Sequence, residues 1–444
     1  MMRNTTLLAA TLALLTGAAR AETIEVNSTT LLNVARQTRG GLSGQDFELA
    51  KVAPAYELLS ITARGLRNPI ADDLTIVLST WGSYEFQDRR WDNGTQHDLT
   101  GDVLTGYVQG RLIDRHLTLR LGRAQVETGV ARMIQLDGGQ AIGLLPWGFR
   151  ASAYAGVPVS QRFATRSGFR SWNPVGGDLA YGGRLGWSLA LPGIAGRGLD
   201  VGASANVVED DGDPVKQELG ADLRLRLVDP LTVTGFAAYS LYDERISEAS
   251  VRAGWTPLRR LLVEADYRFV APDLFLARNS ILSVFSAEQR QLVGGGATYQ
   301  IGHGLRVGGS YHLQLEPGES GQADEEIGHE ADAHVEWERG DAMVGAEGFF
   351  LDAFENGYVG GRLFGRKELG QAFAAADLVL HRFREEVNGE KLALTGTLSA
   401  GIRFLRGFSA VVSGRGGTTP FLESTFEVLA KLVYEETYRK TEVR

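Results

Sequence analysis

The sequence predicts an all-β fold, a closed antiparallel transmembrane β-barrel of about 18–20 strands within a range of 16–20. Apolar and polar residues alternate over runs of 9 to 14 residues, and short turn segments join the runs. Such runs exceed the strands of about 5–6 residues usual in globular sheets and match the roughly 9–11 residues that cross a bilayer at a tilt. Because lipid offers no partners for backbone N–H and C=O groups, a β-sheet in a bilayer must close into a barrel.

The first 21 residues have the layout of a cleaved signal peptide. Arg3 precedes an apolar stretch of 13 residues, and Ala19-Arg20-Ala21 fits the small-x-small cleavage rule. A membrane anchor is the alternative, but a spanning helix needs about 20 apolar residues. We therefore expect a mature chain that begins at Glu22 in an extracytoplasmic compartment, with its net charge changed from -9 to -11 by the loss of Arg3 and Arg20.

Three further regions are expected after the signal peptide. Residues 22–54 lack a strong strand period and are interpreted as an N-terminal periplasmic extension or plug. Residues 55–436 are expected to form the outer-membrane β-barrel, and residues 437–444 a short charged C-terminal tail.

The alternating runs define twenty candidate strands. They are residues 55–66, 72–86, 100–113, 115–127, 149–158, 179–190, 199–208, 217–228, 230–242, 245–256, 258–270, 288–301, 303–315, 328–339, 341–352, 357–366, 370–382, 390–405, 407–415 and 422–435. Short turns between successive runs predict antiparallel neighbours.

A soluble sandwich or propeller would also show alternation, so the polar faces of the strands matter. In the run DLRLRLV, the polar residues Asp222, Arg224 and Arg226 share one face, and leucines occupy the other. Several successive charges on one strand face are typical of a barrel whose lumen holds water. Aromatic residues also gather near strand ends, where the interfacial girdles of a membrane barrel are expected.

The segment Leu117 to Gln140 carries a resemblance to a known family. Its phrase Leu121-Gly122-Arg123 ends an arginine-bearing strand, and Asp137-Gly138 follows in a predicted loop. This layout resembles a strand-plus-loop segment of Gram-negative outer-membrane barrels of the porin and alginate-export type. The resemblance implies a β-barrel integral to the outer membrane. It gives very little support for alginate as a substrate.

Charged residues on the polar faces of the strands are candidate pore-lining residues, because the opposite face contacts lipid. An arginine at the bilayer midplane on the lipid face costs roughly 2–4 kcal/mol. The candidate pore-lining residues are Arg120, Asp222, Arg224, Arg226, Glu264, Asp266, Arg268, Arg306, His312, Asp332 and Glu336.

Charge is unevenly distributed along the chain. Between Arg111 and Arg184 there are ten arginines and four acidic residues, whereas between Glu316 and Asp341 there are ten acidic residues and one arginine. Like charges along a narrow pore set its ion preference. If the two regions face one another across the lumen, they would orient anionic or zwitterionic solutes; the acidic block is alternatively a solvated loop.

The segment from Val159 to Asp178 is a candidate ligand-binding loop. It mixes guanidinium groups with aromatic rings, a combination that can stack on sugars or anionic rings. The residues concerned are Arg162, Phe163, Arg166, Phe169, Arg170 and Trp172.

Motifs of enzymes and cofactor sites are weak in this sequence. It contains no Cys, and His329 and His334 are five apart on a candidate strand, which places the two rings on opposite faces instead of at a metal site. We expect no enzymatic activity, no metal and no cofactor. The negative net charge argues against a nucleic-acid partner.

The sequence therefore predicts an outer-membrane porin-like channel for passive diffusion of small hydrophilic solutes, anions among them. The alternative is a structural or interaction barrel of a cell-envelope machine, or a barrel that binds or exports a surface polymer. The expected partners are the lipid bilayer, lipopolysaccharide, the barrel assembly machinery, small hydrophilic solutes and a periplasmic or surface protein.

Overall fold

A computed structural model describes most of the chain. The described residues are 22–39, 48–66, 71–86, 99–159, 178–190, 198–228, 230–271, 289–316, 326–352, 356–420 and 422–439. The expected signal peptide, the candidate ligand-binding loop residues 162–172 and the end of the expected tail, residues 440–444, lie outside these ranges.

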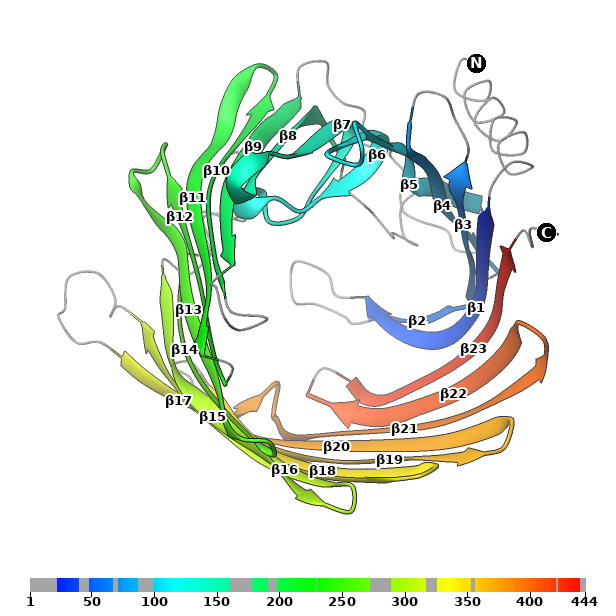
Figure 1. Cartoon of the computed structure of the whole chain (residues 1–444). Coiled ribbons are helices and arrows are strands. Elements are labelled where there is room, and N and C mark those ends of the chain that lie inside the picture. Colours follow the sequence, from blue (N-terminus) through cyan, green and yellow to red (C-terminus); the bar gives the residue numbers. More distant parts are fainter. Residues whose placement is uncertain are drawn as a thin grey trace.

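Within the described ranges the chain forms 23 β-strands and two short 3-10 turns, η1 (Gly129–Ala131) and η2 (Pro146–Gly148) (Figure 1). The strands are β1 (Thr23–Arg39), β2 (Glu48–Val52), β3 (Pro54–Leu66), β4 (Asp73–Glu85), β5 (Leu99–Leu112), β6 (Leu117–Val126), β7 (Ile134–Leu144), β8 (Phe149–Pro158), β9 (Leu179–Ala190), β10 (Gly198–Asp210), β11 (Asp213–Val228), β12 (Leu231–Ser240), β13 (Arg245–Leu258), β14 (Leu261–Val270), β15 (Arg290–Gly302), β16 (Leu305–Glu316), β17 (Glu326–Arg339), β18 (Ala342–Asp352), β19 (Gly357–Leu369), β20 (Ala372–Val387), β21 (Glu390–Leu405), β22 (Phe408–Thr419) and β23 (Leu422–Arg439). In this part of the chain, no helix is long and apolar enough to cross a membrane.

The strands close into one antiparallel barrel. Each strand from β3 onward pairs with the next along the chain, and β1 pairs with β23 from Thr23↔Arg439 to Ala35↔Glu427. Both β2 and β3 pair with β1, so they form one strand interrupted at Ala53. When β2 and β3 are counted as one, the 23 strands form a closed barrel of 22 strands. This is two more than the upper end of the predicted range of 16–20.

The fold class is confirmed, and every one of the twenty candidate strands overlaps a strand of the barrel. Two barrel strands lie where none was predicted. One is β1, in the region interpreted as a periplasmic extension or plug; that interpretation is wrong for Thr23–Arg39 and Glu48–Val52, which are part of the wall. The other is β7, which contains Asp137 and Gly138 and replaces the predicted loop. The last strand continues three residues beyond the expected boundary at 436, to Arg439.

The outer face of the barrel is apolar. On β20 and β21 the exposed residues include Leu378, Leu380, Leu394 and Leu398, which lie an even number of residues apart along each strand and so share one face. In water this much exposed apolar surface would be unfavourable, whereas acyl chains cover it at no such cost. The chain is therefore an integral, multi-pass β-barrel of the outer-membrane type.

Exposed aromatic rings lie toward both ends of the outer face. One group lies near the chain termini and includes Trp147, Phe149, Trp255, Tyr299, Trp337 and Phe404. The other lies near the opposite end and includes Tyr84, Tyr181, Tyr239, Tyr267, Tyr311 and Phe350. Two such groups match the aromatic girdles that membrane barrels place at the two interfaces.

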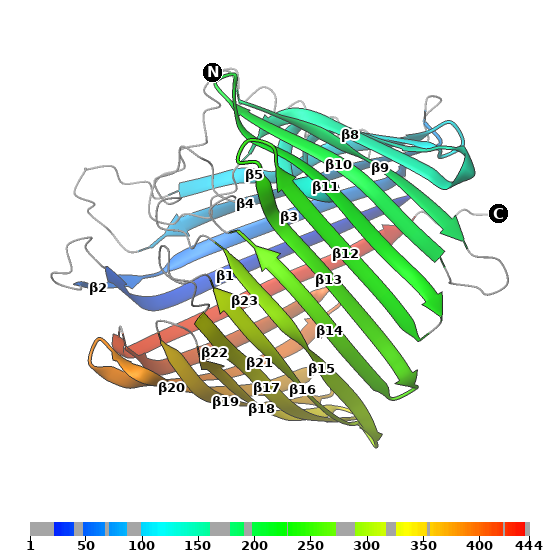
Figure 2. The ribbon, with the colours of Figure 1, turned by 90° about the vertical axis from the view of Figure 1, so that its left-hand side faces the viewer.

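The strands run side by side at a tilt from one end of the barrel to the other (Figure 2). The two ends differ in the number of residues between successive strands. Both described chain ends, at residues 22 and 439, lie at one end, called here the terminal end, where connections such as 259–260 and 370–371 are short. The opposite end, called here the loop end, has the longest connections, 159–178 and 271–289. This asymmetry is typical of outer-membrane barrels.

Candidate functional site

The candidate site is the inner face of the barrel wall. Successive side chains of a strand point to opposite faces, so the residues between the exposed apolar positions face inward. All eleven candidate pore-lining residues, Arg120, Asp222, Arg224, Arg226, Glu264, Asp266, Arg268, Arg306, His312, Asp332 and Glu336, lie at such inward positions. The structure does not gather them into one cluster but distributes them over β6, β11, β14, β16 and β17.

Arg184 holds together three strands of the inner wall. Its guanidinium lies 2.6 Å from Asp222 on β11 and 3.0 Å from Asp200 on β10. A Cβ at Gly202 would lie 2.4 Å from Arg184 Nε, so the absence of a side chain there lets the guanidinium lie flat against the wall. The charge of this arginine is therefore compensated by its neighbours on the same wall.

Several other charged residues of the inner face pair with neighbouring strands. The Asp266 carboxylate and His312 Nε2 are hydrogen-bonded at 3.1 Å, and the contact passes over Gly294 of β15, the strand between them. Arg306 lies 3.9 Å from Glu336, and Asp332 contacts Ser310. Arg120 donates to the Gln109 side chain at 2.9 Å and lies over the Tyr107 ring.

The segment from Thr128 to Met133, between β6 and β7, folds against the inner face of β9–β11. The backbone N–H of Val130 donates to Ser204 Oγ at 2.9 Å, and the Val130 side chain is fully buried. Gly220 lies beneath it, since a Cβ there would approach the Val130 Cβ to 2.8 Å. Ser204 and Gly220 face inward, so this inward-folded segment lies inside the barrel.

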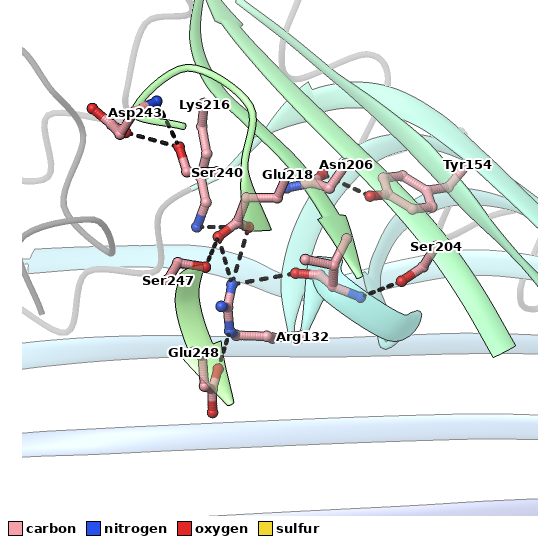
Figure 3. A network of polar contacts seen from close by, with 11 residues as sticks. Arg132, Tyr154, Ser204, Asn206, Lys216, Glu218, Ser240, Asp243, Ser247 and Glu248 are labelled. Atoms are coloured by element: carbon pink, nitrogen blue, oxygen red, sulfur yellow. Dashed lines mark hydrogen bonds and ion pairs between the residues drawn. The ribbon is translucent and has the colours of Figure 1, made fainter. Parts of the chain in front are cut away.

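Arg132 anchors the inward-folded segment with two ion pairs (Figure 3). Its guanidinium lies 3.1 Å from Glu218 and 2.9 Å from Glu248. Glu218 is only 2% exposed and also contacts Lys216 at 3.3 Å and the Ser247 hydroxyl at 3.1 Å. The compensated charges of this network stabilise a buried carboxylate that would be costly alone.

This network was not predicted as a site from the sequence. Glu218 and Arg132 are 86 residues apart, and the pairing requires the inward-folded segment, whose placement no periodic pattern indicates. No sequence pattern indicates the positive φ of Arg132, 54°, either. Among the described residues, no group of three or more His, Cys, Asp or Glu side chains is arranged to hold a metal ion.

Comparison with known proteins places the fold among outer-membrane barrels. No family model matches the chain, and no curated protein matches it. Among solved structures, the chain is similar to the siderophore receptor PirA from Pseudomonas aeruginosa, with a TM-score of 0.57 and 13% identity over 93% of this chain and 80% of that chain. The ferric enterobactin receptor PfeA of the same organism gives a TM-score of 0.55 and 9% identity over 94% and 81% of the two chains.

A third similar structure is OccAB4 from Acinetobacter baumannii, with a TM-score of 0.48 and 9% identity over 94% of this chain and 99% of that chain. At these identities the likeness concerns the fold. The chain has the fold of Gram-negative outer-membrane β-barrels.

Proposed function

We propose that this protein is a porin-like channel through which small hydrophilic solutes diffuse across the outer membrane. The observation that carries the proposal is the inner wall, which presents charged and hydrogen-bonding side chains on strands around the barrel while the outer wall is apolar. Solutes would move down their gradient with no chemical step and no cofactor.

The dimensions of the barrel support an aqueous lumen. Twenty-two strands spaced about 4.8 Å apart and tilted by about 40° enclose a ring about 44 Å across, backbone to backbone. Side chains from opposite walls are too short to meet across that distance. Among the described residues, the inward-folded segment Thr128–Met133 is one element that narrows the lumen.

The pairing of charges favours weak ionic selectivity. Two of the arginines that suggested an anion-guiding wall, Arg132 and Arg184, lie on the inner side of the barrel, and each is within 3.1 Å of a carboxylate of the wall. A compensated pair attracts a passing anion less than a lone arginine does. We therefore propose that the channel prefers small polar solutes. Positions such as Arg224 would add only a minor preference for anions.

The membrane setting follows from the same proposal. With 22 strands the two described chain ends lie at one end, which would face the periplasm, and the loop end would face the cell surface beside lipopolysaccharide. Insertion would require the barrel assembly machinery of the outer membrane.

Planar-bilayer recording of the purified full chain tests the proposal. The fraction of folded barrel is first established from the difference in gel mobility between boiled and unboiled samples. Stepwise, ohmic current increments support the channel. Silent membranes from fully folded protein would instead favour a structural or interaction barrel, or one opened only by a surface polymer.

A further inference from the structure

The inner face of β18–β20 carries a group of aromatic rings. The outward residues of these strands include Val359, Leu363 and Leu378, all exposed and apolar. The intervening positions face the lumen, and they carry Phe349, Tyr358, Arg362, Phe364, Arg366, Phe373, His381 and Phe383. We call these eight residues the aromatic–arginine strip.

At the loop end of the strip, four rings pack together. The ring centroids of Phe349 and His381 are 5.0 Å apart, and those of Tyr358 and His381 are 5.2 Å apart. His381 stacks on Phe383 with an interplanar angle of 17°. Gly360 lies under Phe349, because a Cβ there would come within 2.0 Å of the ring.

Farther toward the terminal end, guanidinium groups lie on rings. Arg362 lies over the Phe364 ring at 4.8 Å, and Arg366 lies over the Phe373 ring at 4.4 Å. Gly345 makes room for Phe364, since a Cβ there would lie 2.2 Å from the ring. Ring-bearing and guanidinium-bearing positions thus follow one another along β19 at steps of about 7 Å, which is two residues of strand.

The glycines explain why the rings lie flat. Phe349, Phe364 and Phe373 each cover a glycine on a neighbouring strand, at 360, 345 and 401 respectively. A ring laid over glycine lies along the wall instead of projecting into the lumen. On Phe364 and Phe373 the guanidinium groups of Arg362 and Arg366 lie over the ring. The wall is therefore smooth, apolar at intervals and half-exposed at the rings.

The charges of the strip are compensated. Arg362 lies 2.5 Å from Asp377 and 3.9 Å from Glu347, and Arg366 lies 2.5 Å from Glu368. Two guanidinium groups thus face three carboxylates, which leaves no positive excess to hold an anion. The same groups retain N–H and carboxylate edges that can bind hydroxyl groups.

We propose that the aromatic–arginine strip is a binding path for neutral oligosaccharides. The flat C–H faces of sugar rings would stack on the Phe349 ring and on the guanidinium planes that lie over Phe364 and Phe373. Their hydroxyl edges would bind the Arg362 and Asp377 pair. Without a bound ligand, rings that face water in the lumen leave apolar surface unburied, which is unfavourable. This proposal rests on the proposed channel, because the sugar must enter the lumen.

Sugar-dependent block of the channel current tests the strip. The probe is maltohexaose, a neutral glucose hexamer, and the comparison solute is a polyethylene glycol of the same hydrodynamic size. We expect maltohexaose to reduce the current of the wild-type chain saturably, and polyethylene glycol to reduce it without saturation. Equal, unsaturated block by the two solutes would overturn the binding path, and saturable block by benzoate but not by maltohexaose would replace neutral sugars with aromatic anions.

The matched variants separate the inner and outer faces of the wall. Phe349→Ala with Phe364→Ala removes two inward rings, and we expect the half-blocking concentration of maltohexaose to rise by about 25-fold, roughly fivefold for each ring contact. Phe350→Ala removes the neighbouring outward ring and should leave the half-blocking concentration unchanged. An unchanged value in the double variant, checked as folded by its gel mobility, would refute the role of the rings.

Calorimetric titration of the detergent-solubilised barrel with maltohexaose distinguishes failure of the strip from failure of the channel. Binding heat from a protein that conducts no current would refute the channel and retain the strip. Current without binding heat and without saturable block would refute the strip and retain the channel.

Discussion

The Arg132 guanidinium lies 2.9 Å from the Glu248 carboxylate, although the two residues are 116 positions apart in the chain. The contact joins the segment between β6 and β7 to β13, three strands beyond the β10 strand that holds Val130. Because it crosses several strands on the inner face, the contact fixes how far this segment reaches into the lumen.

Arg132→Ala should release the inward-folded segment. The substitution deprives Glu218, which is almost fully buried, of one of its cationic partners, and removal of one member of a buried pair costs about 3–5 kcal/mol. We expect a larger and noisier single-channel conductance and a lower free energy of unfolding in urea with lipid vesicles. Arg406→Ala is the control, since Arg406 is 88% exposed beside Glu436 and such a pair contributes about 0–1 kcal/mol. Identical behaviour of the two variants would contradict an anchoring role for Arg132.

Gly294→Ala should disrupt the wall between β14 and β16. A Cβ at this position would lie 2.1 Å from the Tyr311 carbonyl oxygen and 2.6 Å from the His312 ring, which spans Gly294 to reach Asp266. Overpacking of this kind costs about 1–3 kcal/mol. The control is Gly254→Ala, where a Cβ would meet no atom within 4 Å. The temperature at which the folded form disappears from gels should fall for the first variant only, and equal temperatures would refute the crowding.

The alternating period was sufficient to predict twenty strands but failed for β1, for an identifiable reason. On β1 the outward positions include Ser28 and Thr30, whose hydroxyls donate to Glu57 at 2.6 Å and 2.5 Å, while Leu31 faces inward. The polar side chains are satisfied by each other, so they need no water and the expected apolar and polar faces are locally reversed.

The period failed for β7 because the inward-folded segment covers its inner face. Leu136 points inward and is buried against Val126, Ala131 and Tyr154, so an apolar residue occupies a position that alternation assigns to a polar one. Because β7 also contains glycines and the pair Asp137-Gly138, its composition is that of a turn. Only the tertiary structure shows that Thr128–Met133 supplies the cover.

Strand faces could be predicted for the candidate site, but partners could not. Alternation alone placed His312 and Asp266 on polar faces, and the structure adds that they pair across an intervening strand. That pairing depends on the register of β14–β16, which bulges such as the one between Gln300 and Gly302 adjust. The rings of the aromatic–arginine strip come from three strands and share no sequence motif.

The charged inward positions should make a modest contribution to ion selectivity. Replacing Arg120, Arg224 and Arg226 together by glutamine should shift the reversal potential in a KCl gradient toward cations. The change in permeability ratio should stay below about fivefold, since a charge in a water-filled lumen interacts by about 1 kcal/mol or less. Arg382→Gln, at an outward position near the loop end, is the control and should leave the potential unchanged. An unchanged reversal potential in the triple variant would remove these three residues from the pore lining.

The two faces of β21 should respond oppositely to a new charge. Leu398 is 70% exposed and would tolerate arginine in a protein surrounded by water. In a bilayer the same change places a guanidinium among acyl chains. It should make folding into lipid vesicles less favourable by about 2–4 kcal/mol. Thr397→Arg is the matched control, because Thr397 faces the lumen directly opposite Asp377 and the new charge would gain a partner. Equal folding free energies for Leu398→Arg and Thr397→Arg, measured by urea titration in vesicles, would show that acyl chains do not cover the outer face.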